Sequence, residues 1–404
     1  MKILFVNKYL FPKGGSETYV MALGKCLESH GNPVQFFGMD HSERCLGNTV
    51  NAYSDNMDFH SRGRLNKISY PVRTIYNAKS RKKIRQVLDD FQPDAVHLNN
   101  FSYQLTPSII LEIDRWRKET GKKCRIVYTA HDYNLICPNH MLYNVEQHRC
   151  CESCLGGHFA NCTKNRCIHG SLARSMVGSA EAFFWNGYGV YRLIDSVICC
   201  SQFMKSKMDS NPFFKDKTVV MHNFVEEIEE QETAVTEKKD YILYFGRFSE
   251  EKGILTLLNV CRELPGIPFV FAGSGPLETR INGAGENVIN VGFLRGEQLR
   301  KMIREARFSV CPSEWNENCP MSVLESQALG TPVVGAEIGG IPELIREGKT
   351  GELFRAGDAA DLKKTIEVLW NDREKTLSYS KTCREQENDT VEQYMNKLME
   401  IYKG

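Results

Sequence analysis

The chain has 404 residues, of which 42% are hydrophobic and 25% are charged, and its formal net charge is +1. This length exceeds one ordinary hydrophobic core and suits two domains of roughly 200 residues each. A nearly neutral chain argues against nucleic acid as a partner, and no run approaches the ~20 apolar residues of a membrane-spanning helix.

The first apolar run, within residues 1–8, is too short for a signal peptide and predicts a buried first strand. After it, short apolar runs alternate with longer amphipathic stretches, which predicts parallel strands joined by crossover helices. The expected strands of the first half cover residues 2–6, 33–38, 95–98, 125–130, 196–200 and 218–221. Those of the second half cover residues 241–245, 268–272, 288–291, 308–311, 332–335 and 350–354.

An acidic segment, residues 226–240, interrupts this alternation. It is poor in apolar residues, so it predicts a linker between two domains. We therefore expect a first domain over residues 1–225, a second over 241–385 and a C-terminal helix over 386–404. Open α/β sheets bind ligands beyond the carboxyl ends of their strands, so residues that follow the expected strands are candidates for a site.

In the first half, Gly14 and Gly15 follow the first expected strand and open a helix. Such a turn can bring backbone N–H groups to an anion, although a glycine pair is also a simple tight turn. His131 and Asp132 follow the strand at 125–130. A histidine there could hydrogen-bond a ligand, but the tripeptide alone favours a core histidine capped by its neighbouring carboxylate.

In the second half, Arg247 follows the strand at 241–245, and Lys252 lies five residues beyond it. An arginine fork holds phosphate oxygens bidentately, and a lysine adds a mobile point charge. Gly273 ends the next strand, where a glycine allows close approach of a ligand or simply makes a turn. Taken alone, this pattern fits a diphosphate site and a solvated surface loop equally well.

Two glutamates, Glu317 and Glu325, have seven residues between them. Pro320 is expected to be the first residue of a helix. Because proline has no N–H, the N–H groups of Met321 and Ser322 would face a phosphate at the helix start. Glu325 would present its carboxylate two turns after Glu317. The alternative to a binding site is that Glu317 is an ordinary acid in a loop and Glu325 an exposed residue of a helix.

The order and spacing of these blocks resemble the retaining glycosyltransferases of family 4. The resemblance implies the α/β GT-B fold, in which two doubly wound Rossmann-like domains face each other across a cleft. It implies an N-terminal acceptor-binding domain and a C-terminal domain that binds the nucleotide sugar. In such enzymes a C-terminal helix often packs back on the first domain.

The resemblance also implies roles for individual residues. Glu317 would contact hydroxyls of the transferred sugar, and Glu325 would bind the ribose hydroxyls. Arg247 and Lys252 would neutralise the diphosphate leaving group, while His131 would lie at the reaction centre. The implied mechanism is a front-face displacement that retains the anomeric configuration, with the protein stabilising charge on the diphosphate.

The same resemblance places Gly14 and Gly15 beside the donor phosphates and the acceptor. This chain departs from many relatives after Glu317, where Asn-Cys-Pro-Met replaces Gly-Phe-Gly-Leu. Phosphate contacts would therefore come from Met321 and Ser322. No Asp-x-Asp occurs in the sequence, so we expect no catalytic metal and no cofactor other than the sugar nucleotide, which is the substrate.

Six of the 15 cysteines fall in an expected loop insertion at about residues 137–170. Their spacing is compatible with a structural tetrahedral Zn²⁺ site, and buried thiols or a redox-sensitive disulfide are the alternatives. The candidate zinc ligands are Cys151, Cys154, Cys162 and Cys167, with Cys137 and Cys150 as alternates. Without an export signal, the cysteines indicate a reduced protein in the cytoplasm.

Residues 61–88 contain nine lysines and arginines and no acidic residue, with apolar residues between them. Such a surface could dock on anionic lipid headgroups at the inner face of the membrane, at about 1 kcal/mol per well-placed cation. A solvated helix face explains the same pattern equally well.

Taken together, the motifs and the resemblance predict transfer of a sugar from a UDP- or GDP-sugar to a carbohydrate or lipid-linked acceptor. Synthesis of bacterial capsule, O-antigen or exopolysaccharide is the setting that the resemblance implies. The alternatives are a sugar-nucleotide epimerase or hydrolase of the same fold and a non-catalytic sugar-nucleotide-binding protein.

Overall fold

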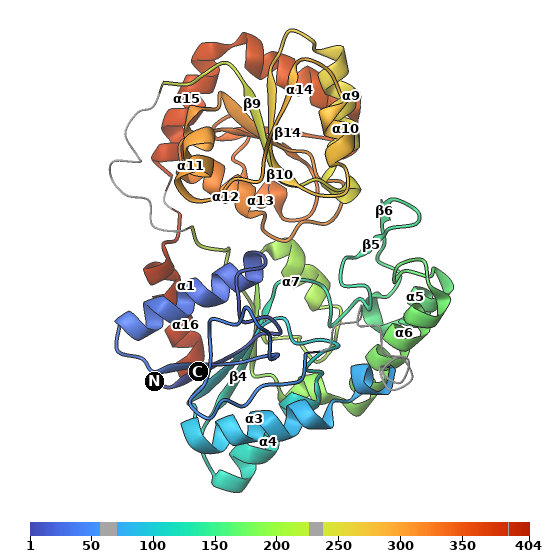
Figure 1. Cartoon of the computed structure of the whole chain (residues 1–404), viewed down its shortest axis with the longest axis vertical. Helices are drawn as coiled ribbons and strands as arrows, with labels where there is room; N and C mark the ends of the chain where they lie inside the picture. Colours follow the sequence, from blue (N-terminus) through green and yellow to red (C-terminus); the bar gives the residue numbers. More distant parts are fainter. Residues whose placement is uncertain (57–70, 226–236, 387) are drawn as a thin grey trace. The chain divides into compact units, whose positions relative to one another are not determined.

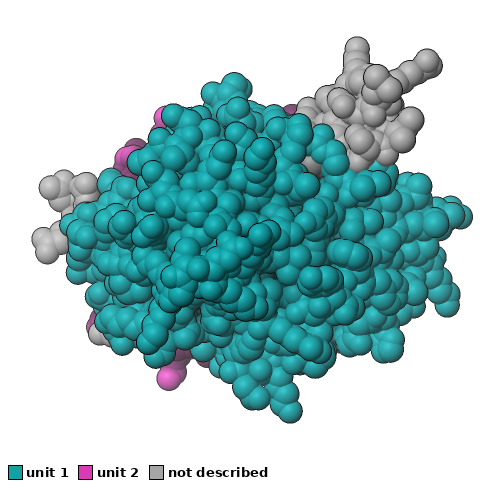
Figure 2. Space-filling view, turned by 90° about the horizontal axis from the view of Figure 1, so that it is seen from below, with its two compact units in different colours: residues 1–146, 151–222, 391–404 teal, residues 147–150, 223–390 magenta. Residues whose placement is uncertain are grey.

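The computed structural model describes residues 1–56, 71–225, 237–386 and 388–404. The chain divides into two compact units, coloured separately in Figure 2. Unit 1 contains residues 1–146, 151–222 and 391–404, and unit 2 contains residues 147–150 and 223–390.

Unit 1 is built on a six-stranded parallel sheet with the strand order β2-β1-β3-β4-β7-β8 (Figure 1). Its strands are β1 (Ile3–Val6), β2 (Val34–Phe37), β3 (Ala95–Leu98), β4 (Arg125–Ala130), β7 (Ser196–Cys199) and β8 (Thr218–Val220). The main helices are α1 (Gly15–Ser29), α3 (Ala78–Phe91), α4 (Ser108–Thr120), α5 (Ala160–Lys164), α6 (Leu172–Tyr188), α7 (Gln202–Met208) and α16 (Val391–Lys403). Every residue of β1 is fully buried, which explains its unbroken apolar sequence.

Unit 2 repeats this plan with the order β11-β10-β9-β12-β13-β14, and its pairs are also parallel. Its strands are β9 (Ile242–Arg247), β10 (Phe269–Ser274), β11 (Val288–Gly292), β12 (Phe308–Cys311), β13 (Val333–Ala336) and β14 (Gly351–Phe354). Its helices are α9 (Ile254–Glu263), α10 (Glu278–Asn282), α11 (Gly296–Glu305), α12 (Met321–Ala328), α13 (Ile341–Leu344), α14 (Ala359–Asn371) and α15 (Arg373–Arg384). All twelve predicted strands are confirmed, within two residues at each end.

The C-terminal helix α16 belongs to unit 1, where two of its tyrosines join a buried polar network. The Tyr394 hydroxyl lies 3.0 Å from the Tyr19 hydroxyl of α1. The Tyr402 hydroxyl lies 2.6 Å from Nδ1 of His97 in β3. Because these groups are buried, each hydrogen bond avoids the cost of an unsatisfied polar atom and fixes α16 on the sheet.

Two local predictions are wrong. Pro320 is the N-cap of α12 rather than its first helical residue, and its extended backbone (φ −66°, ψ 120°) starts the helix at Met321. The predicted linker does not continue to residue 240, because Lys238 is buried in unit 2. Its Nζ donates a hydrogen bond of 2.6 Å to Oγ1 of Thr331. Residues 226–236 of that linker lie outside the described residues.

Candidate functional site

The centre of the candidate site in unit 2 is an ion pair between Lys252 and Glu317. Lys252 Nζ donates a hydrogen bond of 2.5 Å to Glu317 Oε1. The same oxygen accepts a 2.6 Å hydrogen bond from the hydroxyl of Ser313. Burial by itself lowers the pKa of Lys252, but the Glu317 carboxylate more than offsets this and raises the pKa above its usual value. Lys252 is therefore held as a cation against a buried carboxylate.

Lys252 reaches this position through a tight turn at the carboxyl end of β9. A short 3-10 helix (Glu250–Lys252) ends at Gly253, which has a positive φ of 70°. A Cβ atom at Gly253 would lie 1.8 Å from the carbonyl oxygen of Pro312, so only glycine fits there. The glycine thereby brings the Lys252 loop against the chain that follows β12.

Glu317 is fixed by a glycine pair that the sequence analysis missed. The N–H of Gly340 donates a 2.7 Å hydrogen bond to the carbonyl oxygen of Glu317. Gly339 has a φ of 59°, and a Cβ atom there would lie 2.3 Å from the same carbonyl oxygen. The sequence feature that could have predicted this contact is the pair Gly339-Gly340 directly before α13. It repeats the glycine pair at Gly14 and Gly15, which also precedes a helix.

The other predicted donor residues lie on different elements of unit 2. Arg247 is exposed at the end of β9, and its carbonyl oxygen accepts a 2.8 Å hydrogen bond from the Tyr244 hydroxyl. Glu325 is half-buried on α12. Met321 and Ser322 are the first two residues of that helix, so their N–H groups lack intrahelical partners.

Gly273 ends β10 in close contact with β9. A Cβ atom at Gly273 would lie 1.9 Å from the carbonyl oxygen of Gly246. This position therefore requires glycine for strand packing, whether or not a ligand is bound. Its role in donor binding remains a prediction.

In unit 1, His131 follows β4 as predicted and is held by two neighbours. Its Nε2 lies 2.9 Å from Oδ1 of Asn99, and its ring packs edge-on against Tyr19 at 4.8 Å between centroids. Because an amide oxygen only accepts, Nε2 carries the proton. Burial lowers the pKa of His131 to about 4, with a smaller opposing effect from Asp132. The imidazole is therefore neutral at pH 7.

The carboxylate of Asp132 orients the imidazole of His140. Asp132 lies 3.4 Å from Nδ1 of His140. Its carboxylate also accepts a 2.9 Å hydrogen bond from the N–H of Asn134. The capping of His131 by its neighbouring carboxylate stays a prediction.

Gly14 and Gly15 lie at the exposed start of α1, where Gly14 is the N-cap in an extended conformation. The first turn already contains a buried carboxylate, that of Glu17. Its Oε1 accepts hydrogen bonds of 2.9 Å from Asn7 and 3.0 Å from Ser16. A carboxylate there is favourable at the positive end of the helix, and phosphate binding by the glycine pair stays a prediction.

The cysteine-rich insertion forms a small buried cluster. Cys154, Cys162 and Cys167 pack there with Phe159 and Ala182. The 15 cysteines, all within the described residues, are thiols rather than members of a disulfide. Within the described residues, no three His, Cys, Asp or Glu side chains are arranged to hold a metal ion. The zinc site, with Cys151 as the fourth ligand and Cys137 or Cys150 as alternates, stays a prediction.

The basic stretch is partly neutralised where the structure describes it. Arg73 and Lys79 lie 2.9 and 2.8 Å from Oδ2 of Asp55. The remaining ion pairs join Arg81 to Glu112 and Arg85 to Asp89, Glu112 and Glu119. The cations at positions 62, 64 and 67 lie outside the described residues. Among the helices that are described, none is long and apolar enough to cross a membrane.

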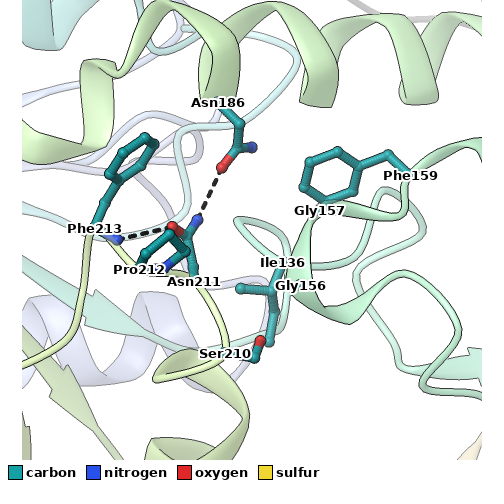
Figure 3. A pocket seen from close by; sticks show the side chains of 9 residues that line it. All are labelled: Ile136, Gly156, Gly157, Phe159, Asn186, Ser210, Asn211, Pro212 and Phe213. Atoms are coloured by element: carbon teal, nitrogen blue, oxygen red, sulfur yellow. Dashed lines mark hydrogen bonds between the residues drawn. The ribbon is translucent and has the colours of Figure 1, made fainter.

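A separate cavity of about 150 Å³ lies in unit 1 (Figure 3). Asn186 and Asn211 meet at its edge through a 2.8 Å hydrogen bond. It is lined by Ile136, Gly156, Gly157, Phe159, Asn186, Ser210, Asn211, Pro212 and Phe213. None of the predicted catalytic or donor-binding residues lines it.

Two family models match consecutive parts of the chain. The model described as Glycosyltransferase Family 4 matches residues 13–227, which is more than half of the chain. The chain belongs to glycosyltransferase family 4. The model described as Glycosyl transferases group 1 matches residues 225–386 of this family 4 member, which include all the predicted residues of unit 2.

Curated relatives of this family 4 member include named transferases. Sulfoquinovosyl transferase SQD2 of Arabidopsis thaliana is 34% identical over 154 residues, covering 37% of the chain and 30% of SQD2. An uncharacterized 42.6 kDa protein in the cps region of Klebsiella pneumoniae is 26% identical over 86% of the chain and 88% of that protein. The putative colanic acid biosynthesis glycosyltransferase WcaL of Escherichia coli is 29% identical over 39% of the chain and 43% of WcaL.

Solved structures match this family 4 member over its whole length. Sucrose-phosphate synthase of Thermosynechococcus elongatus matches with a TM-score of 0.69 and 18% identity, covering 100% of the chain and 98% of the synthase. Anabaena HepE in complex with UDP-glucose matches with a TM-score of 0.64 and 16% identity, covering 100% and 99%. At such identities the likeness concerns the fold, and the GT-B prediction is confirmed.

Proposed function

We propose that this family 4 glycosyltransferase transfers a hexose from a nucleoside diphosphate sugar to a carbohydrate or lipid-linked acceptor. The observation that carries the proposal is the contact between Lys252 and Glu317 beyond the carboxyl ends of β9 and β12. A cation and a carboxylate held side by side match the two parts of such a donor. The diphosphate pairs with the cation, and the sugar hydroxyls donate hydrogen bonds to the carboxylate.

Donor binding would exchange partners within this pair. The diphosphate oxygens replace Glu317 as the partner of Lys252, and exposed Arg247 supplies a second cation. Glu317, still held by the Ser313 hydroxyl, then accepts hydrogen bonds from the sugar. Met321 and Ser322 donate their backbone N–H groups to phosphate at the start of α12. Glu325 accepts the ribose hydroxyls.

The chemical step on this proposal is a front-face displacement. The bond between the anomeric carbon and the diphosphate oxygen breaks, and the acceptor oxygen bonds to the carbon on the same face. The acceptor proton passes to the leaving phosphate, so the configuration is retained. Lys252 and Arg247 stabilise the charge that develops on the leaving group, and no metal is needed for that purpose.

The relatives guide the choice of substrates. The complex of HepE with UDP-glucose supports a UDP-sugar as the first donor to test, followed by GDP-sugars. The name of WcaL supports a bacterial surface polysaccharide as the product. We place the reaction in the cytoplasm at the inner face of the membrane, where a lipid-linked acceptor is available.

The test incubates the purified full chain with a panel of UDP- and GDP-sugars in the presence of EDTA. Each reaction runs with and without lipid-linked acceptors, and nucleotide release and product linkage are measured. Acceptor-dependent release with a retained linkage is expected. Nucleotide release or epimerisation without an acceptor would contradict the proposal and identify a hydrolase or an epimerase. Tight binding of the sugar nucleotide without turnover would identify a non-catalytic binding protein.

A further inference from the structure

Helix α6 (Leu172–Tyr188) presents a large apolar face to solvent. Its most exposed large apolar side chains are Leu172 (47%), Met176 (54%), Phe183 (48%), Phe184 (46%) and Tyr188 (62%). At 100° per residue these five side chains fall on one side of the helix. Single exposed apolar residues are ordinary, but a contiguous set on one helix marks an interaction surface.

The opposite face of α6 is turned inward and combines Trp185 and Ala182 with polar side chains. Ser175 and Ser179 are buried, and their hydroxyls are satisfied. The Ser175 hydroxyl accepts a 3.0 Å hydrogen bond from the N–H of Ile168, and the Ser179 hydroxyl donates one of 2.8 Å to the carbonyl oxygen of Phe159. The helix is therefore seated partly through these hydrogen bonds, while a set of large apolar side chains stays outward, unlike on an ordinary surface helix.

A tryptophan fixes this orientation. Trp185 is fully buried, and its indole N–H donates a 2.8 Å hydrogen bond to the carbonyl oxygen of Ile75. Its ring also stacks on Tyr76 at 6.1 Å between centroids. Rotation of α6 to hide its apolar face would break these contacts, so the outward face belongs to the folded unit.

Cations predominate in the chain segment that contains α6. Residues 153–194 contain four lysines and arginines, all exposed, and a single acidic residue, Glu181. Glu181 is buried on the inner side of α6, and burial raises its pKa to about 8. Within residues 153–194 the exposed charges are therefore all cations, whereas one exposed carboxylate from outside this segment, that of Glu146, lies beside Gly170 just before α6. The four cations are Lys164, Arg166, Arg174 and Arg192. Figure 1 shows α5 and α6 side by side in unit 1.

We propose that the apolar face of α6, flanked by these cations, docks unit 1 on an anionic lipid surface. Apolar and aromatic side chains on one face with Lys and Arg beside them are the pattern of a helix that lies in the membrane interface. The cations attract anionic headgroups, and the five apolar side chains enter the boundary between headgroups and acyl chains. This surface differs from residues 61–88, whose described cations include four that pair with carboxylates of unit 1.

The experiment uses the full-length protein and vesicles of phosphatidylcholine, alone or with about one-third phosphatidylglycerol to supply negative charge. Binding is measured by flotation. The test variant is Leu172→Gln/Met176→Gln/Phe183→Gln. The matched control is Phe293→Gln/Val368→Gln/Leu377→Gln, which removes three equally exposed apolar side chains from unit 2. A second test variant, Arg174→Glu, leaves the apolar face intact.

We expect the natural chain to bind anionic vesicles and float with them. The partitioning of the triple α6 variant onto these vesicles should be at least tenfold lower, and that of the control should be unchanged. The partitioning of Arg174→Glu should fall at least fivefold on anionic vesicles and stay unchanged on neutral ones. This variant tests the proposal if the triple variant unfolds. Equal binding of natural chain and α6 variants, or no binding of the natural chain, would overturn the proposal. A dimer of the natural chain that the triple variant converts to monomer without vesicles would assign the face to a second copy instead.

Discussion

The ammonium of Lys252 lies 2.5 Å from Oε1 of Glu317, although the two residues are 65 positions apart in the chain. The contact joins the turn after β9 to the segment after β12. Gly253 and Gly339 allow the backbone to approach closely on either side of it, because a Cβ atom at either position would collide with backbone atoms. An isolated buried ion pair is weak evidence for stability. Its location beyond two strand ends makes a functional role the better explanation.

Lys252→Ala should lower the rate of sugar transfer by about a hundredfold or more, because the developing charge on the diphosphate loses its half-buried cation. Lys252→Arg should retain part of the activity. Steady-state kinetics with the donor found in the panel measures both. The matched control is Lys363→Ala on α14, which breaks an exposed pair with Glu263 of α9 in the same unit. If the Lys252→Ala protein keeps its folding temperature and its normal rate, the assignment of this cation fails.

Glu325→Ala should raise the KM for the donor by about 10- to 100-fold, since a charged acceptor to the ribose hydroxyls is lost. The turnover number should change little. Glu367→Ala removes a comparably half-buried carboxylate from another helix of unit 2 and should leave KM unchanged. If Glu325→Ala keeps the natural KM for the donor, Glu325 does not bind the nucleotide.

His131→Ala should reduce transfer by about a hundredfold while nucleotide binding, measured by calorimetry, stays normal. The expected split follows because His131 lies in unit 1, whereas the predicted nucleotide ligands lie in unit 2. Asn99→Ala should give a smaller loss, because Asn99 holds the Nε2 proton of His131 through its amide oxygen. The exposed His30 provides the control substitution. Transfer that survives His131→Ala would remove this residue from the reaction.

Stability should rise with pH from about 7 toward 10 because of Lys238. Burial lowers the pKa of Lys238 to about 7 from its usual 10.5. The unfolded chain then binds more protons than the folded one across this window, so each pH unit adds up to ~1.4 kcal/mol to the free energy of unfolding. Denaturant titration between pH 7 and 10 measures the slope. Lys238→Met should flatten it, and an unchanged slope would contradict the burial of a neutral amine.

The strands were predictable because parallel strands buried on both faces require unbroken apolar runs, as in Ile3–Val6. Contacts between distant segments were not. Lys238 follows an acidic, polar stretch, and only its packing against Thr331 shows that it is buried. Asp132 precedes Tyr133 but binds His140, because the chain turns back at that point.

Periodicity also could not decide which face of α6 points inward. Large apolar side chains occur on both sides of this helix, with Trp185 on the inner side and Phe183 and Phe184 on the outer side, so periodicity does not single out one face for burial. The hydroxyls of Ser175 and Ser179 help to hold the inner side through hydrogen bonds to Ile168 and Phe159, which a pattern of hydrophobicity does not contain.

The most direct test of the donor site is a crystal structure of the protein with an intact UDP- or GDP-sugar. We expect Lys252 Nζ within hydrogen-bond distance of a diphosphate oxygen and separated from Glu317, whose carboxylate accepts a hydrogen bond from the sugar. A donor bound elsewhere, with the contact between Lys252 and Glu317 unchanged, would contradict the account.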